Sequence, residues 1–264
     1  MKFRSPIDIT RSVIFALVLR EMRTRFGQRR MGAFWMIAEP LLHLIMFTVL
    51  MGILRNRADF HDIPYPVFLL VAVAPFILFR GICLLVMEGV NANRALFAYK
   101  QIMPLDTFIA RALMQFCITS SVYILVTAGF AWYGFDMRIS QPLEWMLTLA
   151  AGIAFSFGLG VILAIVTNAA PDVRNIIRML FLPLYFISGV VYPPSHMSPA
   201  IIPYLTWNPY LHIIELLRTF VFPHYEPIPQ TSPAYVFACT LAALFIGLGL
   251  YRVRKLKLLA ITGV

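Results

Sequence analysis

The sequence predicts an all-α protein that crosses a membrane six times, and three observations lead to this prediction. Of the 264 residues, 60% are hydrophobic and only 13% are charged, whereas an ordinary soluble domain carries about 25% charged residues. The mean hydropathy is +0.80. Six segments are almost free of charge, and most of them reach the roughly 20 residues that a bilayer-spanning helix needs. This composition argues against a soluble enzyme, a nucleic-acid-binding protein and a fibrous protein.

The first element is an amphipathic helix predicted over residues 8–30. Phe15, Leu19, Met22 and Phe26 recur at helical spacing and form one apolar stripe. The polar side chains expected on the opposite face are Arg20, Glu21 and Thr24. Such a helix lies in the membrane surface. It either anchors the chain through arginines on lipid phosphates or frames an entrance for an anionic lipid-linked substrate.

Six spanning segments follow this helix. They are predicted over residues 31–54, 63–87, 106–135, 145–170, 173–192 and 232–252. The fourth carries a small residue at every fourth position, which lets another helix approach closely. These residues are Gly152, Ser156, Gly160 and Ala164. The stripe is compatible with a contact inside the chain or with a dimer contact.

Prolines divide residues 193–222 into short pieces, beginning with Pro193 and Pro194. Asn208 is a suitable N-cap and Pro209 a suitable first residue for the last of these helices. The pieces are either re-entrant helices, which enter the membrane and return on the same side, or an extramembrane loop with short surface helices. Non-helical backbone within a bilayer must be buried in protein or line a wet cavity. The re-entrant interpretation therefore makes this segment a candidate outer gate of a translocation path.

The net charge of +10 reflects membrane topology. With six spans, 17 Lys and Arg residues fall on the side of both termini and four on the other side. Because positive loops stay in the cytoplasm, both termini are predicted to be cytoplasmic.

The cytoplasmic segment 91–103 contains a predicted short helix. Asn91 or Asn93 can cap it, and its apolar side chains are unusual for a free loop. They include Leu96, Phe97 and Tyr99. The segment either docks into a groove of another protein or lies on the membrane surface.

Polar residues within the apolar segments are costly and mark functional candidates. Glu39 and His43 lie on one helix face and could bond each other. Arg80 either faces a wet cavity that carries an acidic polymer or forms a structural ion pair, for example with Glu88. Farther along, His212, Glu215 and Arg218 are spaced three residues apart, which is a weak metal signal and more typical of an interhelical polar network. The aromatic residues around these three positions have three alternative interpretations, which are an aromatic belt at the membrane interface, core packing, and stacking platforms for sugar rings.

The sequence shows no catalytic motif and no metal site. It contains no phosphate-binding loop, because none of its four lysines follows a glycine. The three cysteines share no metal-type or redox spacing. If the protein does work against a gradient, the energy must therefore come from a partner or an ion.

Six blocks, in order and over nearly the whole chain, resemble one family of transporters. They include LREMRTRFGQRRMGAFWMIAEPLLHL at 19–44, NRALFAYKQIMPLDTFIARAL at 93–113, LPLYFISGVVYPP at 182–194 and WNPYLHIIELLR at 207–218. The remaining two blocks are PYPVFLLVAVAPFILF at 64–79 and LFIGLGLYRVRK at 244–255. The chain thus resembles the membrane-spanning permease of group 2 capsular polysaccharide exporters, which have the ABC-2 (type V) exporter fold.

This resemblance implies the partners. Two permeases would form a homodimer that binds two copies of a cytoplasmic ABC ATPase, and ATP and Mg²⁺ would sit on that ATPase while this chain binds no cofactor. Residues 91–103 would be the coupling helix. Its ATPase-coupling residues would be Asn91, Asn93, Arg94, Leu96, Phe97, Tyr99 and Lys100.

The resemblance also implies the path of the substrate. The lipid head group would meet Arg20, Arg23, Arg25 and Arg29 on the 8–30 interface helix. Candidate channel-lining residues are Trp35, Glu39, His43, Arg80, Tyr185 and Tyr192. The re-entrant periplasmic gate at 193–222 would include Pro193, Pro194, Trp207, Asn208, Pro209, His212, Glu215 and Arg218.

The implied function is export of a lipid-linked acidic capsular polysaccharide across the bacterial inner membrane, followed by transfer through periplasmic and outer-membrane capsule export proteins. Membrane lipids are further partners and nucleic acid is not. Alternatives are an ABC-2 exporter of O-antigen, teichoic acid, or a small lipid or drug. A membrane-embedded glycosyl- or acyltransferase is the alternative from another class.

Overall fold

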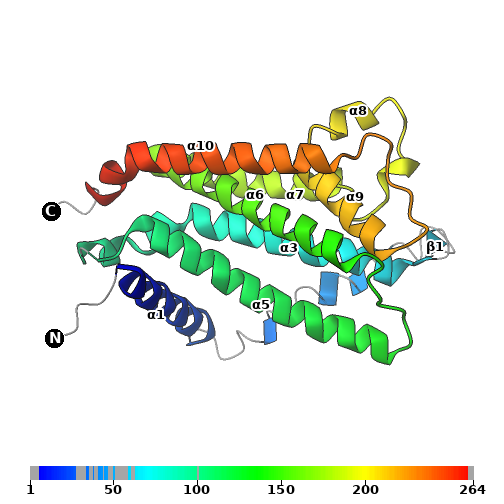
Figure 1. The fold of residues 1–264 in the computed structure, drawn as a ribbon, viewed down its shortest axis with the longest axis horizontal. Coiled ribbons are helices and arrows are strands. Elements are labelled where there is room, and N and C mark those ends of the chain that lie inside the picture. The colour runs from blue at the N-terminus through cyan, green and yellow to red at the C-terminus, as the bar shows by residue number, and fades with distance from the viewer. Residues whose placement is uncertain are drawn as a thin grey trace.

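The computed structural model describes residues 6–27, 34–35, 38, 41–43, 45–46, 50, 59–60, 63–99 and 101–260. These residues form a bundle of long helices (Figure 1). They are α1 (Pro6–Gly27), α3 (Tyr65–Met87), α5 (Pro104–Trp132), α6 (Pro142–Ala169), α7 (Val173–Ile187) and α10 (Pro233–Ala260). The shorter elements are β1 (Asp59–Phe60), β2 (Ile63–Pro64), α4 (Gly89–Ala92), η1 (Arg94–Ala98), η2 (Pro194–His196), α8 (Ile202–Leu205) and α9 (Pro209–Val221).

Four helices among the described residues, α3, α5, α6 and α10, are long and apolar enough to cross a membrane. They overlap the predicted segments 63–87, 106–135, 145–170 and 232–252. The predicted segment 31–54 lies largely outside the described residues. Helix α7 has 15 residues, or ~22 Å at the α-helical rise, which is shorter than the roughly 30 Å of a bilayer core. Among the described residues, length and composition therefore support four spans, and the prediction of six stays a prediction.

Helix α3 is the centre of the bundle. It packs against α5, α6 and α9, α10 packs along α6, and α1 packs against α5. Because α3 is apolar around most of its surface, most of it can be buried, and its one charged residue, Arg80, is exposed. Its fully buried side chains include Phe68, Leu69, Phe79 and Ile82.

Glycines set the closest helix contacts. A Cβ on Gly158 of α6 would lie 2.7 Å from the carbonyl carbon of Ala243 on α10, so a larger residue would force these two helices apart. The small-residue stripe of α6 instead faces α3. A Cβ on Gly152 would collide with the Phe79 ring, and one on Gly160 would lie 2.8 Å from the Val86 Cβ. The stripe therefore makes a contact inside the chain.

Helix α10 continues to Ala260, beyond the predicted end of the span at residue 252. The prediction ended where positive charges begin. Lys and Arg are good helix formers, and their long side chains can keep the charge in water beside an apolar surface. The exposed members are Arg252, Arg254 and Lys257.

The connection between α3 and α5 also differs from the expected helix over 91–103. It consists of α4 and η1, and the chain becomes extended at Tyr99. Helix α4 ends at Asn93, whose backbone leaves the regular helix geometry. The Asn93 side-chain amide donates to the Gly89 carbonyl (3.0 Å), a local bond that competes with helix continuation. Helix α5 then starts at Pro104, with the Asp106 carboxylate accepting from the Met103 N–H (2.9 Å).

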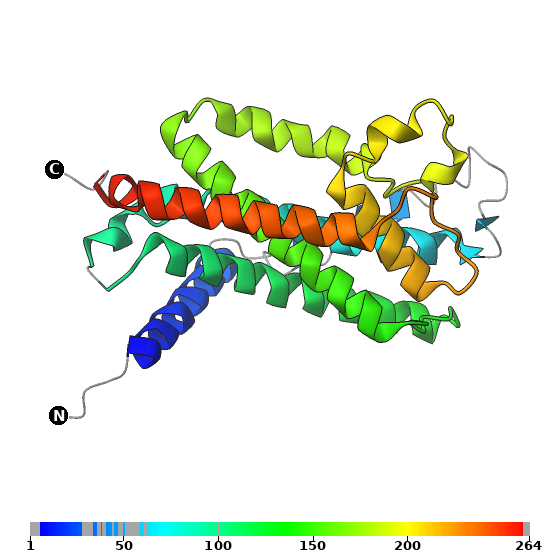
Figure 2. The same ribbon diagram turned by 45° about the horizontal axis from the view of Figure 1, so that its top comes forward.

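The bundle has two distinct ends (Figure 1). One end, here the terminal end, holds the end of α10, the α3–α5 connection and the α6–α7 turn. The other, the hairpin end, holds the β1–β2 hairpin, the α5–α6 loop and the chain from the end of α7 to the start of α10. In the second view α1 extends obliquely away from the bundle at the terminal end (Figure 2).

Candidate functional site

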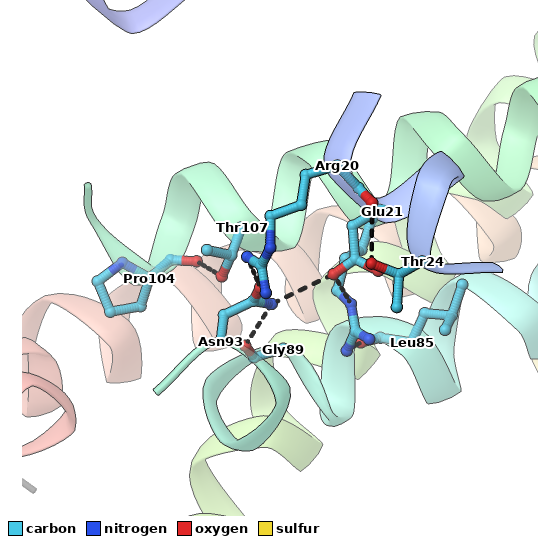
Figure 3. Close-up of polar contacts among 9 residues, drawn as sticks. Arg20, Glu21, Thr24, Leu85, Gly89, Asn93, Pro104 and Thr107 are labelled. Atoms are coloured by element: carbon cyan, nitrogen blue, oxygen red, sulfur yellow. Dashed lines mark hydrogen bonds and ion pairs between the residues drawn. The ribbon is translucent and has the colours of Figure 1, made fainter. Parts of the chain in front are cut away.

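A polar cluster at the terminal end joins α1, α5 and the α3–α5 connection. Asn93 lies at its centre, between Gly89 and Glu21 (Figure 3). The Arg20 guanidinium donates to the Asn93 side-chain oxygen (2.9 Å), and the Asn93 amide donates to the Glu21 carboxylate (3.4 Å). The Arg111 Nε donates to the same Glu21 oxygen (2.9 Å). We call these four residues, Arg20, Glu21, Asn93 and Arg111, the α1 cluster.

Three of the four members of the α1 cluster are shielded from solvent, whereas Arg20 is exposed. The side chains of Glu21 and Arg111 are 11% and 10% exposed, and Asn93 is buried. Arg111 also donates to the Leu85 carbonyl (2.9 Å), so its charge is bonded on two sides. Removing one partner of such a pair leaves an uncompensated buried charge and costs about 3–5 kcal/mol.

A second set of contacts reaches the same connection from α7. The Glu88 carboxylate accepts from the Arg178 Nη2 (2.8 Å) and forms an ion pair with the Arg174 Nε (3.2 Å). Glu88 therefore pairs with two arginines of α7, which differs from the expected pairing with Arg80. The Arg178 side chain is 50% exposed. Solvent-exposed pairs of this kind contribute only about 0–1 kcal/mol.

The connection also presents a free surface. An open groove runs along Asn91, Ala92, Arg94, Ala95 and Ala98. Tyr99 follows the groove in the chain and is 66% exposed. This surface is available to a partner protein.

A groove of about 980 Å³ separates α1 from α5. Its wall is mainly apolar, with Thr10, Arg11 and Ser12 towards the start of α1. The apolar part consists of Ile14, Phe15, Val18, Leu113 and Cys117. Such a groove can accommodate an acyl chain, with arginine close to a phosphate.

One contact joins the predicted first span to α7. The His43 ring nitrogen Nε2 lies 2.8 Å from the Tyr185 hydroxyl. The Tyr185 ring in turn meets the Phe76 ring of α3 edge-on, with centroids 5.2 Å apart. Two of the predicted channel-lining residues are thus direct neighbours.

The hairpin end contains a buried ion pair on α9. Arg218 donates to the carbonyls of Gly189 and Val190 (2.7 Å each) and lies 3.4 Å from the Glu215 carboxylate. Its guanidinium carbon is 3.7 Å from the centre of the Phe68 ring, which adds a cation–π contact. Both charged side chains are fully buried. Arg218 therefore fixes the turn after α7 onto α9 and α3.

Glu215 receives further donors from the loop before α10. The Tyr225 hydroxyl donates to its carboxylate at 2.7 Å, and the Ile228 N–H donates at 3.4 Å. Burial raises the pKa of the Tyr225 hydroxyl, which keeps this group protonated and able to donate. Glu215 and Arg218 together therefore hold three separate segments at the hairpin end.

His212 is part of the same structural arrangement. Its Nδ1 accepts from the Ser232 N–H (3.2 Å), so its Nε2 carries the proton and donates to the Thr206 carbonyl (2.7 Å). Both ring nitrogens are engaged by protein groups. Among the described residues, no group of three His, Cys, Asp or Glu side chains could hold a metal ion.

Comparison with known proteins identifies the family. The sequence matches the ABC-2 type transporter family over residues 12–222. The chain belongs to the ABC-2 type transporter family.

Individual ABC-2 relatives match over nearly their whole length. The polysialic acid transport protein KpsM of Escherichia coli is 38% identical over 96% of this chain and 97% of its own. The capsule polysaccharide export inner-membrane protein CtrC of Neisseria meningitidis serogroup B is 26% identical over 94% and 93%. BexB of Haemophilus influenzae, with the same description, is 26% identical over 93% and 92%.

The residues predicted to couple to an ATPase separate into two groups by exposure. Arg94 and Tyr99 are exposed, and Asn91 and Leu96 are half-buried. Asn93 and Phe97 are buried, so they face the bundle rather than a partner. Lys100 lies outside the described residues. Phe97 is buried because η1 turns its ring into the apolar core.

The arginines predicted to meet the lipid head group and the remaining predicted channel-lining residues differ in exposure. Arg20 is engaged by Asn93, and Arg23 is exposed. The Arg25 side chain, Arg29 and Glu39 lie outside what the structure describes. Trp35 is exposed and meets Phe34 edge-on. Arg80 is exposed on α3, and Tyr192 is half-buried.

The predicted gate residues lie in α9 and in the chain before it. Asn208 is the N-cap of α9, its oxygen accepting from the Tyr210 N–H (3.1 Å), and Pro209 begins the helix. Pro193 precedes η2, which starts at Pro194. Trp207 is 81% exposed.

Sequence reasoning missed Glu21 and Arg111. Glu21 was expected on the outer face of α1, but it is buried against α5. The helix turns Leu17 and Glu21 towards the bundle and leaves the stripe residues Phe15 and Leu19 exposed, as a lipid-facing stripe requires. Two signals were available in the sequence. Glu21 is a lone carboxylate among arginines, and Arg111 is a lone arginine near the start of an apolar segment.

Proposed function

We propose that this chain is the permease subunit of an ATP-driven exporter that moves lipid-linked acidic capsular polysaccharide from the cytoplasm across the inner membrane. The single observation that carries the proposal is the match, over 96% of this chain, to a protein named for polysialic acid transport. Two further relatives are named as inner-membrane proteins of capsule polysaccharide export. Four apolar helices agree with an integral membrane protein.

The energy comes from a partner ATPase. The sequence has no Gly-Lys-Ser/Thr phosphate-binding loop. The exposed groove along Asn91–Ala98, with Tyr99 beside it, is a suitable docking surface for that ATPase. ATP and Mg²⁺ are held by the partner, and this chain supplies the moving membrane part.

The working unit is a homodimer with two ATPases. Helix α7 carries a large exposed apolar surface that a second copy could cover, and this surface supports the proposal. Its members include Ile176, Met179, Leu180 and Leu182. The Tyr185–His43 contact lies between α7 and the segment before α3, where the two copies would frame a polymer channel.

The positive charge at the terminal end supports a cytoplasmic location for both termini. The α1 groove would admit the lipid end of the polymer, and the elements between residues 193 and 222 would form a periplasmic gate held in place by Arg218. Periplasmic and outer-membrane capsule proteins would receive the polymer.

Deletion of the gene followed by complementation tests this function. Cells without the chain should lose surface capsule and accumulate lipid-linked polymer inside, and the full-length chain should reverse both effects. Loss of O-antigen with normal capsule would instead favour the function of a 21% identical relative, the O-antigen export permease RfbA of Myxococcus xanthus. Unchanged surface polymer of both kinds would reject the proposal.

A further inference from the structure

The connection between α3 and α5 is attached to its neighbours by two polar contacts that differ in burial. Asn93 joins it to α1, and Glu88 joins it to α7. The two attachment residues are only five positions apart in the chain. Any movement of the connection therefore reaches both helices through these contacts.

The attachment to α1 is buried and fully bonded. Asn93 accepts from Arg20 and donates to Glu21 and to the Gly89 carbonyl, so its side chain has three partners. The Glu21 charge is balanced by Arg111 at 2.9 Å. With water largely excluded, opening this contact would leave buried charges and an amide without partners. The α1 cluster therefore holds α1, the connection and α5 in one arrangement.

The attachment to α7 is less well shielded, since the side chains of Arg178, Arg174 and Glu88 are 50%, 27% and 19% exposed. Both α7 arginines meet one oxygen of Glu88, and Arg178 is half exposed. Water can replace such a contact at little cost. Among the described residues, α7 packs on the bundle chiefly through α3, with Phe181 and Tyr185 buried in the core. Its contact with the connection can therefore open more easily than the contact of α1 can.

We propose that α1 and residues 88–99 move as one rigid unit, and that the Glu88 ion pairs are a detachable contact through which this unit releases and recaptures α7. In this scheme Glu21, Asn93 and Arg111 are positioning residues, because they transmit motion without touching polymer or nucleotide. The inference rests on the proposed function and adds to it the route by which ATPase movement reaches the helices.

Substitutions separate transmission from docking. Glu21→Gln and Asn93→Asp weaken the α1 cluster, the second by placing a carboxylate against Glu21. We expect the full-length chain to retain its copurifying ATPase and most ATP hydrolysis, while polymer exported per ATP falls at least about fivefold. Normal export per ATP in both variants would overturn the inference. Loss of ATPase copurification would also overturn it, because the cluster would then only shape the docking surface.

Covalent cross-links give a matched test that simple instability cannot imitate. In a chain whose Cys83, Cys117 and Cys239 are replaced, the pair Arg20→Cys and Asn93→Cys should export poorly until a bis-maleimide joins α1 to the connection. Cross-linking should then restore export, because these elements are not expected to separate. The matched pair, Glu88→Cys and Arg178→Cys, should export before cross-linking and stop afterwards.

Either cross-linking experiment can overturn the inference. If the first cross-link does not restore export, or if the second leaves export unchanged, the rigid-unit inference is wrong. Single-cysteine variants treated with the same reagent control for chemical modification alone. If the unsubstituted complex exports no polymer with ATP, the proposed function fails first, so the two failures are distinguishable.

Discussion

Arg111 of α5 donates its Nε proton to the carboxylate of Glu21 on α1, at 2.9 Å and across 90 positions of sequence. This buried bond ties α1 to the helix bundle at the point where the α3–α5 connection also attaches. The arrangement places the surface that we assign to the ATPase next to the groove that we assign to the lipid end of the substrate. Four predictions follow from other parts of the structure.

Gly158 should tolerate no side chain. Gly158→Ala would place a Cβ 2.7 Å from the backbone of α10, and the helices must then separate at a cost of about 1–3 kcal/mol. The control is Gly249→Ala on α10, where a Cβ meets nothing within 4 Å. Melting of the purified protein in detergent should show destabilisation for the first variant only. Equal melting temperatures would contradict the close α6–α10 contact.

Arg218 should be required for stability at the hairpin end. Arg218→Ala removes two carbonyl bonds and leaves Glu215 buried with less compensation, which should lower the free energy of unfolding by about 3–5 kcal/mol. Arg218→Lys should rescue only partly, because an ammonium lacks the planar fork that reaches both carbonyls. Arg138→Ala, at an exposed position, is the control. Wild-type melting of Arg218→Ala would disprove the structural role.

Tyr99 and Phe97 should behave differently although both were expected to dock. Tyr99→Glu changes an exposed side chain and should weaken ATPase binding by about 2 kcal/mol without affecting melting. Phe97→Glu places a charge in the core and should instead reduce the amount of folded protein. Copurification of the ATPase, normalised to folded permease, distinguishes the two. Full ATPase recovery with Tyr99→Glu would exclude this surface as the docking site.

Arg80 should affect export rather than folding. It is exposed on α3, and Glu88 pairs with α7 instead, so Arg80→Gln should change stability by no more than about 0.5 kcal/mol. If it faces an acidic polymer, export per folded molecule should fall severalfold and Arg80→Lys should restore it. A loss of stability with normal export per folded molecule would support a structural role.

Hydropathy alone was sufficient to predict α3, α5, α6 and α10, because each carries a long apolar run that has no other stable location. The start of α9 was predictable from Asn208 and Pro209, whose capping preferences are local. The small-residue stripe of α6 predicted a close helix contact but not its partner. Which helix fits against Gly152 and Gly160 depends on the tertiary arrangement.

The polar clusters were harder to predict because their partners are distant in sequence. Glu21 depends on Arg111 and Asn93, and nothing near Glu21 indicates that it turns inward. The break in the expected 91–103 helix has the same origin, since Asn93 exchanges helix geometry for bonds to Gly89 and α1. Arg218 was recognised as part of a polar network, but its carbonyl partners at residues 189 and 190 have no side-chain signal.

ATP-dependent transport into inverted inner-membrane vesicles tests the central claim most directly. Vesicles that contain the chain and its ATPase would receive radiolabelled lipid-linked polymer, and protection from an added polymer-degrading enzyme would be measured. The account predicts protection that requires ATP and the full-length chain and is lost when either is omitted. Equal protection in vesicles without the chain, or without ATP, would contradict it.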